Sequence, residues 1–262
     1  MRAATYNVWN ENKGKGDRFD QLMHEITTVD ADIIGLQEVT RYFFDTHLEL
    51  LTQYPYKHYE MYSNEDEGLA ILSKYPITET FFLHTASKYA NSNALHVNVQ
   101  VGNSRLSFTN IHLPWDSAIA KETQIVAIDA FIHEQYKQKT AEYYLLVGDF
   151  NCGFDSSVHR FLLGDQTLQD AESNPYWQEL SSSYAALHNL PLQPTLDFVK
   201  NPRWQGKNTI YIPCAVDRMY LMDNWTPCSL QFAGIFGTAV SSINNLSASD
   251  HYGVLADLHI PE

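Results

Sequence analysis

The segment LLVGDFNCGFD, residues 145–155, joins an apolar run to a polar ending, and this combination decides how the chain is interpreted. The apolar run is typical of a buried strand that begins near Tyr143. It stops on Asp149 and Asn151, with Gly148 and Gly153 close on either side. Carboxylate and amide groups at the end of a buried strand either cap a loop or begin a functional site. The rest of the chain decides between these two interpretations.

The composition indicates one globular domain over residues 1–262. Of the 262 residues, 44% are hydrophobic and 18% charged, which is enough for a sizeable core. No stretch approaches the roughly 18 uninterrupted apolar residues of a membrane helix, so we expect no integral membrane segment. The N-terminus lacks an apolar leader and the three cysteines are scattered, so we predict a cytoplasmic protein. No pattern specifies an oligomeric state.

The charge balance limits the class of substrate. The formal net charge is −14, with 17 lysines and arginines against 31 acidic residues, and the basic residues form no run. Proteins that bind long nucleic acids usually do so through clustered lysine and arginine. Long duplex DNA is therefore a poor candidate, and we expect the partner to be a phosphate-ester substrate: a small molecule, a lipid headgroup or a nucleic-acid end.

Strand-like patterns outnumber helical ones along the chain. Helical spacing covers residues 17–30, 41–54 and 116–137, the last with Asp116 or Ser117 as N-cap. Residues 154–209 are expected to form loops and short helices. Strands are predicted at residues 2–8, 31–39, 56–63, 68–76, 94–102, 106–114, 143–150, 215–223, 229–237 and 251–260. This order favours a layered α/β fold with two sheets and outer helices over a βαβ nucleotide-binding sheet.

Polar residues recur where the predicted strands begin or end. Three carboxylates, Glu38, Asp149 and Asp250, lie at the margins of apolar runs, where a charge is rarely buried unless it is paired or bound to a metal. A hard cation such as Mg²⁺ prefers carboxylate oxygens, and an imidazole beside a carboxylate holds or moves a proton. The set suits metal-assisted hydrolysis of a phosphate ester. Its other members are Asn7, His112, Asn151, Asp217 and His251.

Seven short motifs span nearly the whole chain: TYN (5–7), LQEV (36–39), GLAILSKYPI (68–77), NIHL (110–113), GDFN (148–151), VDR (216–218) and SDH (249–251). In this order they resemble the endonuclease/exonuclease/phosphatase superfamily, which is deoxyribonuclease-I-like. The resemblance implies a four-layered α/β sandwich, with two mainly antiparallel β-sheets face to face and flanked by helices. It also implies a phosphoric ester hydrolase that depends on Mg²⁺ or Mn²⁺.

The resemblance implies a metal site and its surroundings. Glu38 would be the main metal ligand, with Asn7 and Asp250 completing the metal shell. Glu67, which directly precedes the GLAIL motif, would orient His112 as in the deoxyribonucleases. These positions are therefore expected to lie at one end of the sandwich.

The remaining residues are expected to perform the chemistry. His112 and Asn151 would contact the scissile phosphate, and Asp149 would position or deprotonate the attacking water. Asp217 would orient His251 by a hydrogen bond and favour its charged form. Whether Asp149 or His251 is the formal base stays open at this stage.

The substrate is less constrained than the chemistry. The segment PTLDFVKNPRWQG (194–206) followed by VDRMYL is similar to the layout of tyrosyl-DNA phosphodiesterases, whereas GLAILSKYPI with NIHLPW resembles sphingomyelinases. Trp9 and Trp115 lie close in sequence to Asn7 and His112, and are candidates for stacking on a substrate. A non-catalytic binding module on the same fold is the alternative from another class.

Overall fold

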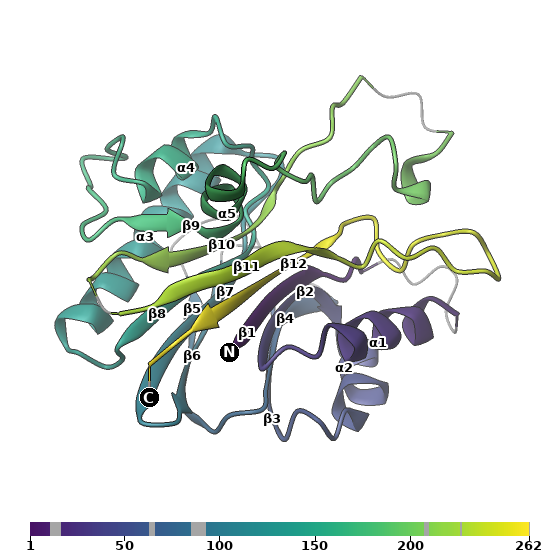
Figure 1. The fold of residues 1–262 in the computed structure, drawn as a ribbon, viewed down its shortest axis with the longest axis horizontal. Coiled ribbons are helices and arrows are strands. Elements are labelled where there is room, and N and C mark those ends of the chain that lie inside the picture. The colour runs from purple at the N-terminus through teal and green to yellow at the C-terminus, as the bar shows by residue number, and fades with distance from the viewer. Residues whose placement is uncertain (11–16, 63–65, 85–92, 207–209, 226, 262) are drawn as a thin grey trace.

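A computed structural model describes residues 1–10, 17–62, 66–84, 93–206, 210–225 and 227–261 (Figure 1). Twelve strands in the described residues form two six-stranded sheets. The first sheet contains β1 (Arg2–Asn7), β2 (Ile33–Thr40), β3 (Tyr56–Met61), β4 (Glu67–Ser73), β11 (Ser229–Phe236) and β12 (Gly253–His259). The second contains β5 (Ile77–His84), β6 (Asn93–Val101), β7 (Ser104–His112), β8 (Tyr143–Asp149), β9 (Trp177–Glu179) and β10 (Asp217–Met222).

Each sheet has one parallel pair at its centre. The first sheet has the order β11-β12-β1-β2-β4-β3, and only β1 and β2 run parallel. The second has the order β5-β6-β7-β8-β10-β9, and only β7 and β8 run parallel. The carboxyl ends of a parallel pair meet at one edge of the sheet. The residues that end these four strands are therefore brought together in two pairs.

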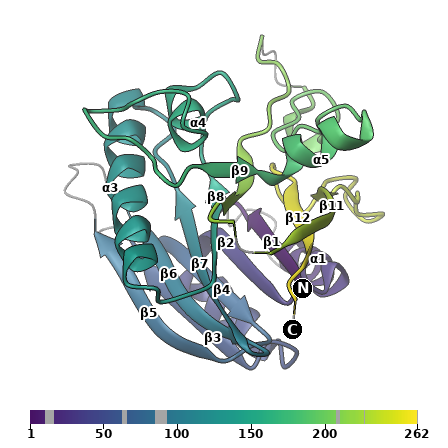
Figure 2. The same ribbon diagram turned by 60° about the vertical axis from the view of Figure 1, so that its left-hand side comes forward.

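Helices cover the outer face of each sheet. These are α1 (Asp17–Val29), α2 (Arg41–Thr46), α3 (Ala118–Lys137) and α4 (Ser157–Leu162), with short 3₁₀ turns at Leu48–Leu50 and Pro202–Trp204. The remaining helix, α5 (Leu180–His188), packs against β10 and β11 and contributes to the core between the sheets. In Figure 1 α1 and α2 lie on the side of the first sheet, and in both views α3 lies along the second (Figure 1, Figure 2). This is the predicted four-layered α/β sandwich.

Three apolar cores hold the four layers together. The central core lies between the sheets and joins residues such as Ile33 and Val254 of the first to Phe108 and Leu145 of the second. One outer core packs α1 and α2 on the first sheet, and the other packs α3 and α4 on the second. Strands buried on both faces need near-continuous apolar sequence, which explains runs such as that ending at Asp149.

The observed elements follow most of the sequence expectations, with three differences. One is the strand β9, which lies within the segment 154–209 that was expected to form loops and short helices. The helix predicted over residues 41–54 is interrupted at His47, where α2 gives way to a 3₁₀ turn. The strand β5 was not predicted, and it lies at the edge of its sheet with no fully buried residue. The last residue of the strand predicted over 56–63 lies outside the described residues. The N-cap of α3 is Ser117, which accepts a hydrogen bond from Ala120 N.

Among the described helices, none is long and apolar enough to cross a membrane.

Candidate active site

Strand register in the second sheet places three of the predicted residues side by side. His112 ends β7 and pairs with Asp149, the last residue of the parallel strand β8. Asp149 in turn pairs with Asp217, the first residue of the antiparallel strand β10. All three side chains are buried. The polar ending of the segment at 145–155 therefore lies between two other polar strand ends.

A β-bulge in the first sheet directs Glu38 toward this row. The register between β2 and β4 shifts between Leu36 and Val39, and Glu38 has a left-handed backbone with φ of 57°. Such a conformation is uncommon for a residue other than glycine and marks a position held by its surroundings. A bulge bends the strand and changes the direction of the side chain. Here it places the Glu38 carboxylate at the end of β2, next to the end of β1.

Asn7 connects the two sheets at this end. Its amide nitrogen donates to Glu38 Oε1 at 2.9 Å and to Asp149 Oδ2 at 3.0 Å, although these two acids belong to different sheets. Its amide oxygen accepts from Trp9 N at 2.9 Å. Since a backbone N–H only donates, this contact fixes which end of the amide faces the carboxylates. Asn7 thus presents its nitrogen to the acids, and its role as a metal ligand stays a prediction.

His251 and Asp217 form a buried pair. Nδ1 of His251 lies 2.9 Å from Oδ2 of Asp217 and 3.9 Å from Oδ2 of Asp149. Burial lowers the pKa of His251, but Asp217 and then Asp149 outweigh it and raise that pKa well above its usual value. Burial raises the pKa of Asp217 as well, against the effect of His251. We assign the pair as carboxylate and imidazolium because the short contact stabilises both charges.

His112 faces the same acids from the other side. Its Nε2 lies 3.9 Å from Oε1 of Glu38 and 3.8 Å from Oδ2 of Asp149. These distances are too long for direct hydrogen bonds. Nδ1 of His112 is buried and has no hydrogen-bond partner among the described residues. The ring thus lies close to both carboxylates without a direct hydrogen bond to either.

Asp250 adds a further acid to the group. Burial, together with the nearby charges of Glu38 and Asp149, raises the pKa of Asp250 to about 6 against the opposing effect of His251. The loop that carries Asp250 is tied to β1, because Ser249 Oγ donates to Asn7 O at 2.8 Å. An acid that resists ionisation beside other carboxylates is a favourable place for a cation.

Asn151 lies at the mouth of the site with a left-handed backbone, φ 48°. Its backbone N–H donates to Oδ1 of Asp149 at 2.8 Å, and its amide nitrogen donates to Leu113 O at 2.8 Å. The turn after β8 is therefore fixed by Asp149 itself. One amide N–H of Asn151 remains available for a ligand.

The predictions for Trp9, Trp115 and Glu67 differ in outcome. Trp115 follows His112 by three residues and is 74% exposed, so it is accessible to a substrate. The ring of Trp9 contacts the guanidinium groups of Arg18 and Arg203, whose carbons lie 5.4 and 5.3 Å from its centroid. Glu67 is buried and accepts a hydrogen bond from Asn10, and its predicted contact with His112 stays a prediction.

Several residues that support the site were not among the predicted ones. Buried Arg18 donates to Val8 O, Ala248 O and Trp9 O, which ties β1 to the loop before Asp250. Thr195 Oγ1 accepts from Asp217 N at 3.0 Å, and Asn201 donates to Ser249 O. Thr195 and Asn201 lie in the segment 194–206, which the sequence analysis identified by its motif. Arg18 lies in a helical pattern, which does not indicate a functional site.

The family model described as the endonuclease/exonuclease/phosphatase family matches residues 4–251. The chain belongs to the endonuclease/exonuclease/phosphatase family. A comparison with curated protein sequences finds no match. Solved structures of low sequence identity share the fold of this family member. TDP2 from Caenorhabditis elegans has a TM-score of 0.78 at 17% identity, covering 100% of this chain and 74% of that chain.

Two further solved structures have the same fold and different names. TDP2 from D. rerio, complexed with a single strand DNA product, has a TM-score of 0.74 at 16% identity, covering 99% of this chain and 98% of that one. A mannosyl-6-phosphatase from Bacteroides thetaiotaomicron has a TM-score of 0.74 at 16% identity, covering 99% and 100%. Identities this low establish the shared fold alone.

The donor set of this endonuclease/exonuclease/phosphatase family member fits a divalent cation. Ligand atoms of Asp149, Asp217 and His251 lie within 4.8 Å of one another. In that group Nδ1 of His251 is already engaged by Asp217, which leaves the carboxylates as the available ligands. Glu38 lies beside Asp149 through the shared Asn7 donor, and Asp250 is close enough for the two acids to raise its pKa. Carboxylate oxygens of this kind are what Mg²⁺ and Mn²⁺ prefer.

Proposed function

We propose that this chain is a divalent-metal-dependent hydrolase that cleaves a phosphate ester, and most readily a phosphodiester, by attack of water. One observation carries the proposal. Asn7 joins Glu38 of the first sheet to Asp149 of the second, and Oδ2 of Asp149 lies 3.8 Å from His112 Nε2 and 3.9 Å from His251 Nδ1. Phosphoester hydrolysis is the chemistry of the family to which the chain belongs.

Glu38 and Asp250 would hold the cation, Mg²⁺ or Mn²⁺, with Asn7 beside them. When bound, such a cation neutralises charge on a phosphate oxygen and on the leaving oxygen. Asn7 keeps Glu38 oriented by donating to its Oε1. The backbone N–H of Asn10 donates to Glu38 Oε2 at 3.0 Å, so both oxygens are held in place.

The other residues would bind the phosphate group and deprotonate the attacking water. Because His251 is charged in its pair with Asp217, its ring donates to a phosphate oxygen rather than accepting a proton. Asp149 is then the group placed to accept the proton of the attacking water. His112 and the free amide N–H of Asn151 would donate to the remaining phosphate oxygens, which balances charge developing there.

The first test replaces one carboxylate and keeps its shape. Glu38→Gln should lower kcat/KM for bis(p-nitrophenyl) phosphate with Mg²⁺ or Mn²⁺ at least about 100-fold, in the range of a lost metal contact or acid–base group. The matched control is Glu49→Gln, which changes an exposed acid in the 3₁₀ turn that follows α2. Equal rates in the two variants would contradict the proposal and favour a non-catalytic binding module.

The substrate is tested by direct competition. The panel contains single-stranded DNA with a 5′-tyrosyl end, sphingomyelin and small phosphomonoesters such as mannose 6-phosphate. The net charge of −14 disfavours long nucleic acids, so we expect a small diester or a short DNA end to give the highest kcat/KM. Preference for a monoester over every diester would overturn the assignment as a phosphodiesterase.

We further propose that residues 1–262 act as one domain in the cytoplasm. The central core contains side chains from both sheets, which supports cooperative folding of the two halves. Calorimetry should give one transition whose van't Hoff enthalpy equals the calorimetric enthalpy. Two separate transitions would mean that the sheets belong to independent units.

A further inference from the structure

Arg218, the second residue of β10, is a buried charge without an acidic partner. Its side chain is fully buried. Among the described residues its partners are carbonyl oxygens, a hydroxyl and an aromatic ring, and no carboxylate is within salt-bridge distance. Arginine is almost never fully buried unless it is paired. The burial of this cation therefore points to a task beyond packing.

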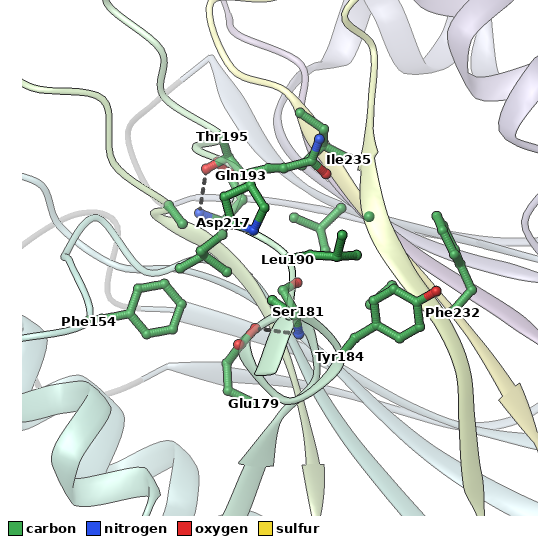
Figure 3. A pocket seen from close by; sticks show the side chains of 17 residues that line it. Phe154, Glu179, Ser181, Tyr184, Leu190, Gln193, Thr195, Asp217, Phe232 and Ile235 are labelled. Carbon is green, nitrogen blue, oxygen red and sulfur yellow. Dashed lines mark hydrogen bonds between the residues drawn. The ribbon is translucent and has the colours of Figure 1, made fainter. Parts of the chain in front are cut away.

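The guanidinium group of Arg218 joins the loop after β8 to the residues before β10. Nη2 donates to Cys152 O and, at 3.0 Å, to Ala215 O. The guanidinium carbon lies 4.3 Å from the centroid of the Phe154 ring. Phe154 and Asp217 line a common pocket, which Figure 3 shows from close by. One buried side chain thus contacts two residues of the loop that leaves Asp149.

The same guanidinium group reaches α4 through two further side chains. Nη1 donates to the hydroxyl of Tyr220 at 3.1 Å, and that hydroxyl lies 2.7 Å from Nδ1 of His159 on α4. Burial and then the charge of Arg218 lower the pKa of His159 to about 4, so the imidazole is neutral at pH 7. Tyr220 therefore accepts from Arg218 and donates to His159. The segment from the loop to α4 is anchored to Arg218 at both ends.

The loop that Arg218 holds begins with Asn151. The left-handed backbone of Asn151, φ 48°, is a conformation that persists only where the surroundings hold it. Asp149 holds one side of this residue by accepting from Asn151 N at 2.8 Å. Arg218 holds the other side by donating to Cys152 O. The chain is thus fixed on both sides of Asn151.

We propose that Arg218 is a positioning residue for the phosphate site, and that it acts by holding the Asn151 amide in the orientation that donates to a phosphate oxygen. The inference rests on the proposed function, because it concerns the part that Asn151 has in phosphate-ester hydrolysis. A guanidinium fork holds several acceptors at fixed angles, whereas an ammonium group is a point charge. A merely structural arginine would affect stability without depending on Asn151.

The first test is a double-mutant cycle between Arg218→Met and Asn151→Ala, with kcat/KM measured for bis(p-nitrophenyl) phosphate and Mg²⁺. Asn151→Ala should lower kcat/KM about 100-fold, the effect of losing one donor to a developing oxyanion, and Arg218→Met about tenfold or more. The double variant should lie within about threefold of Asn151→Ala, because the two residues act as one unit. Losses that multiply would overturn the proposal.

A control addresses stability alone. Tyr144→Phe removes a buried hydroxyl at the start of β8, at the end of the strand opposite Asp149, and should retain kcat/KM within about threefold. Arg218→Lys keeps the charge without the fork, and should recover part of the activity lost in Arg218→Met. A loss in Tyr144→Phe as large as that in Arg218→Met would assign the effect to stability and overturn the positioning role.

Hydrogen exchange followed by NMR tests the positioning without turnover. In Arg218→Met, or in Arg218→Lys where the first variant does not fold, the backbone amide of Asn151 should exchange at least about tenfold faster than in the wild type. The matched reference is the amide of Val199, which donates to Oδ1 of Asp197 at 3.0 Å just as Asn151 donates to Asp149; it should keep its rate. An unchanged Asn151 rate would overturn the positioning role. A faster Asn151 rate in a protein whose wild type hydrolyses no phosphate ester would contradict the proposed function and leave the Arg218 contact in place.

Discussion

The substitution Asp217→Asn tests the pairing at the centre of the site, because it keeps the shape of the side chain and removes its charge. The two atoms of the pair lie 2.9 Å apart, which corresponds to an attraction of about 6 kcal/mol at an effective dielectric constant of about 20. That figure is an upper bound, since desolvation opposes it. Hydrogen bonds to charged groups contribute about 1.5–3 kcal/mol net, and more is lost when a buried charge is left unpaired.

We therefore expect Asp217→Asn to raise the activation free energy by about 2–4 kcal/mol, which is about 30- to 1000-fold in kcat/KM. The pH dependence should change in a defined direction. In the wild type Asp217 raises the pKa of His251 well above 6.5, so the imidazolium persists at neutral pH. Without that charge, burial lowers the pKa, and activity should disappear at a lower pH than in the wild type.

The assay is hydrolysis of bis(p-nitrophenyl) phosphate with Mg²⁺ between pH 5 and 10. Asp223→Asn is the matched control, because Asp223 directly follows β10 at the end of the strand opposite Asp217. A kcat/KM within threefold of the wild type, together with an unchanged upper limb of the pH profile, would refute the reasoning about the pair.

Three further predictions address the site and the fold. His112→Gln should lower kcat/KM about 100-fold or more, in the range of a lost proton-transfer or phosphate contact, and single-turnover kinetics should place the loss in the chemical step. Gly148→Ala should destabilise the chain by about 3 kcal/mol in urea unfolding, because Gly148 has φ of 141° and an added Cβ would lie 2.0 Å from Ile111 O. His96 is buried, which lowers its pKa to about 4. Between pH 6.5 and pH 4 the unfolded chain therefore binds a proton at His96 that the folded chain does not. The free energy of unfolding should fall by up to about 3 kcal/mol between pH 7 and pH 4 for this reason, and His96→Gln should remove that part of the decrease.

Sequence patterns predict the parts of this fold that depend on burial. The continuous apolar runs at β2 and β8 and the long helical spacing of α3 reflect faces that contact a core. Strand β5 was missed because it lies at an edge and has no fully buried residue, so no continuous apolar run is required of it. The interruption at His47 depends on how α2 packs on the first sheet, which is a tertiary effect that local spacing does not report.

The site could be predicted as a set of residues but not as a geometry. Polar residues at strand ends indicated which side chains matter, since charges at the margins of buried strands need partners. The bulge at Glu38 and the orientation of the Asn7 amide depend on the register of β2 with β4 and on the Trp9 N–H. The buried clamp made by Arg18 depends on contacts between residues far apart in the sequence. The bulge, the amide orientation and the Arg18 contacts do not follow from composition or spacing.

The most direct measurement follows the oxygen of water during turnover. Bis(p-nitrophenyl) phosphate should be hydrolysed by the wild type in H₂¹⁸O with Mg²⁺, and mass spectrometry of the phosphomonoester product should reveal one ¹⁸O atom on phosphorus. EDTA should abolish the reaction, and Asp149→Asn should slow it at least about 100-fold. Lack of metal-dependent turnover across the substrate panel, or a product without ¹⁸O on phosphorus, would contradict water attack at this site.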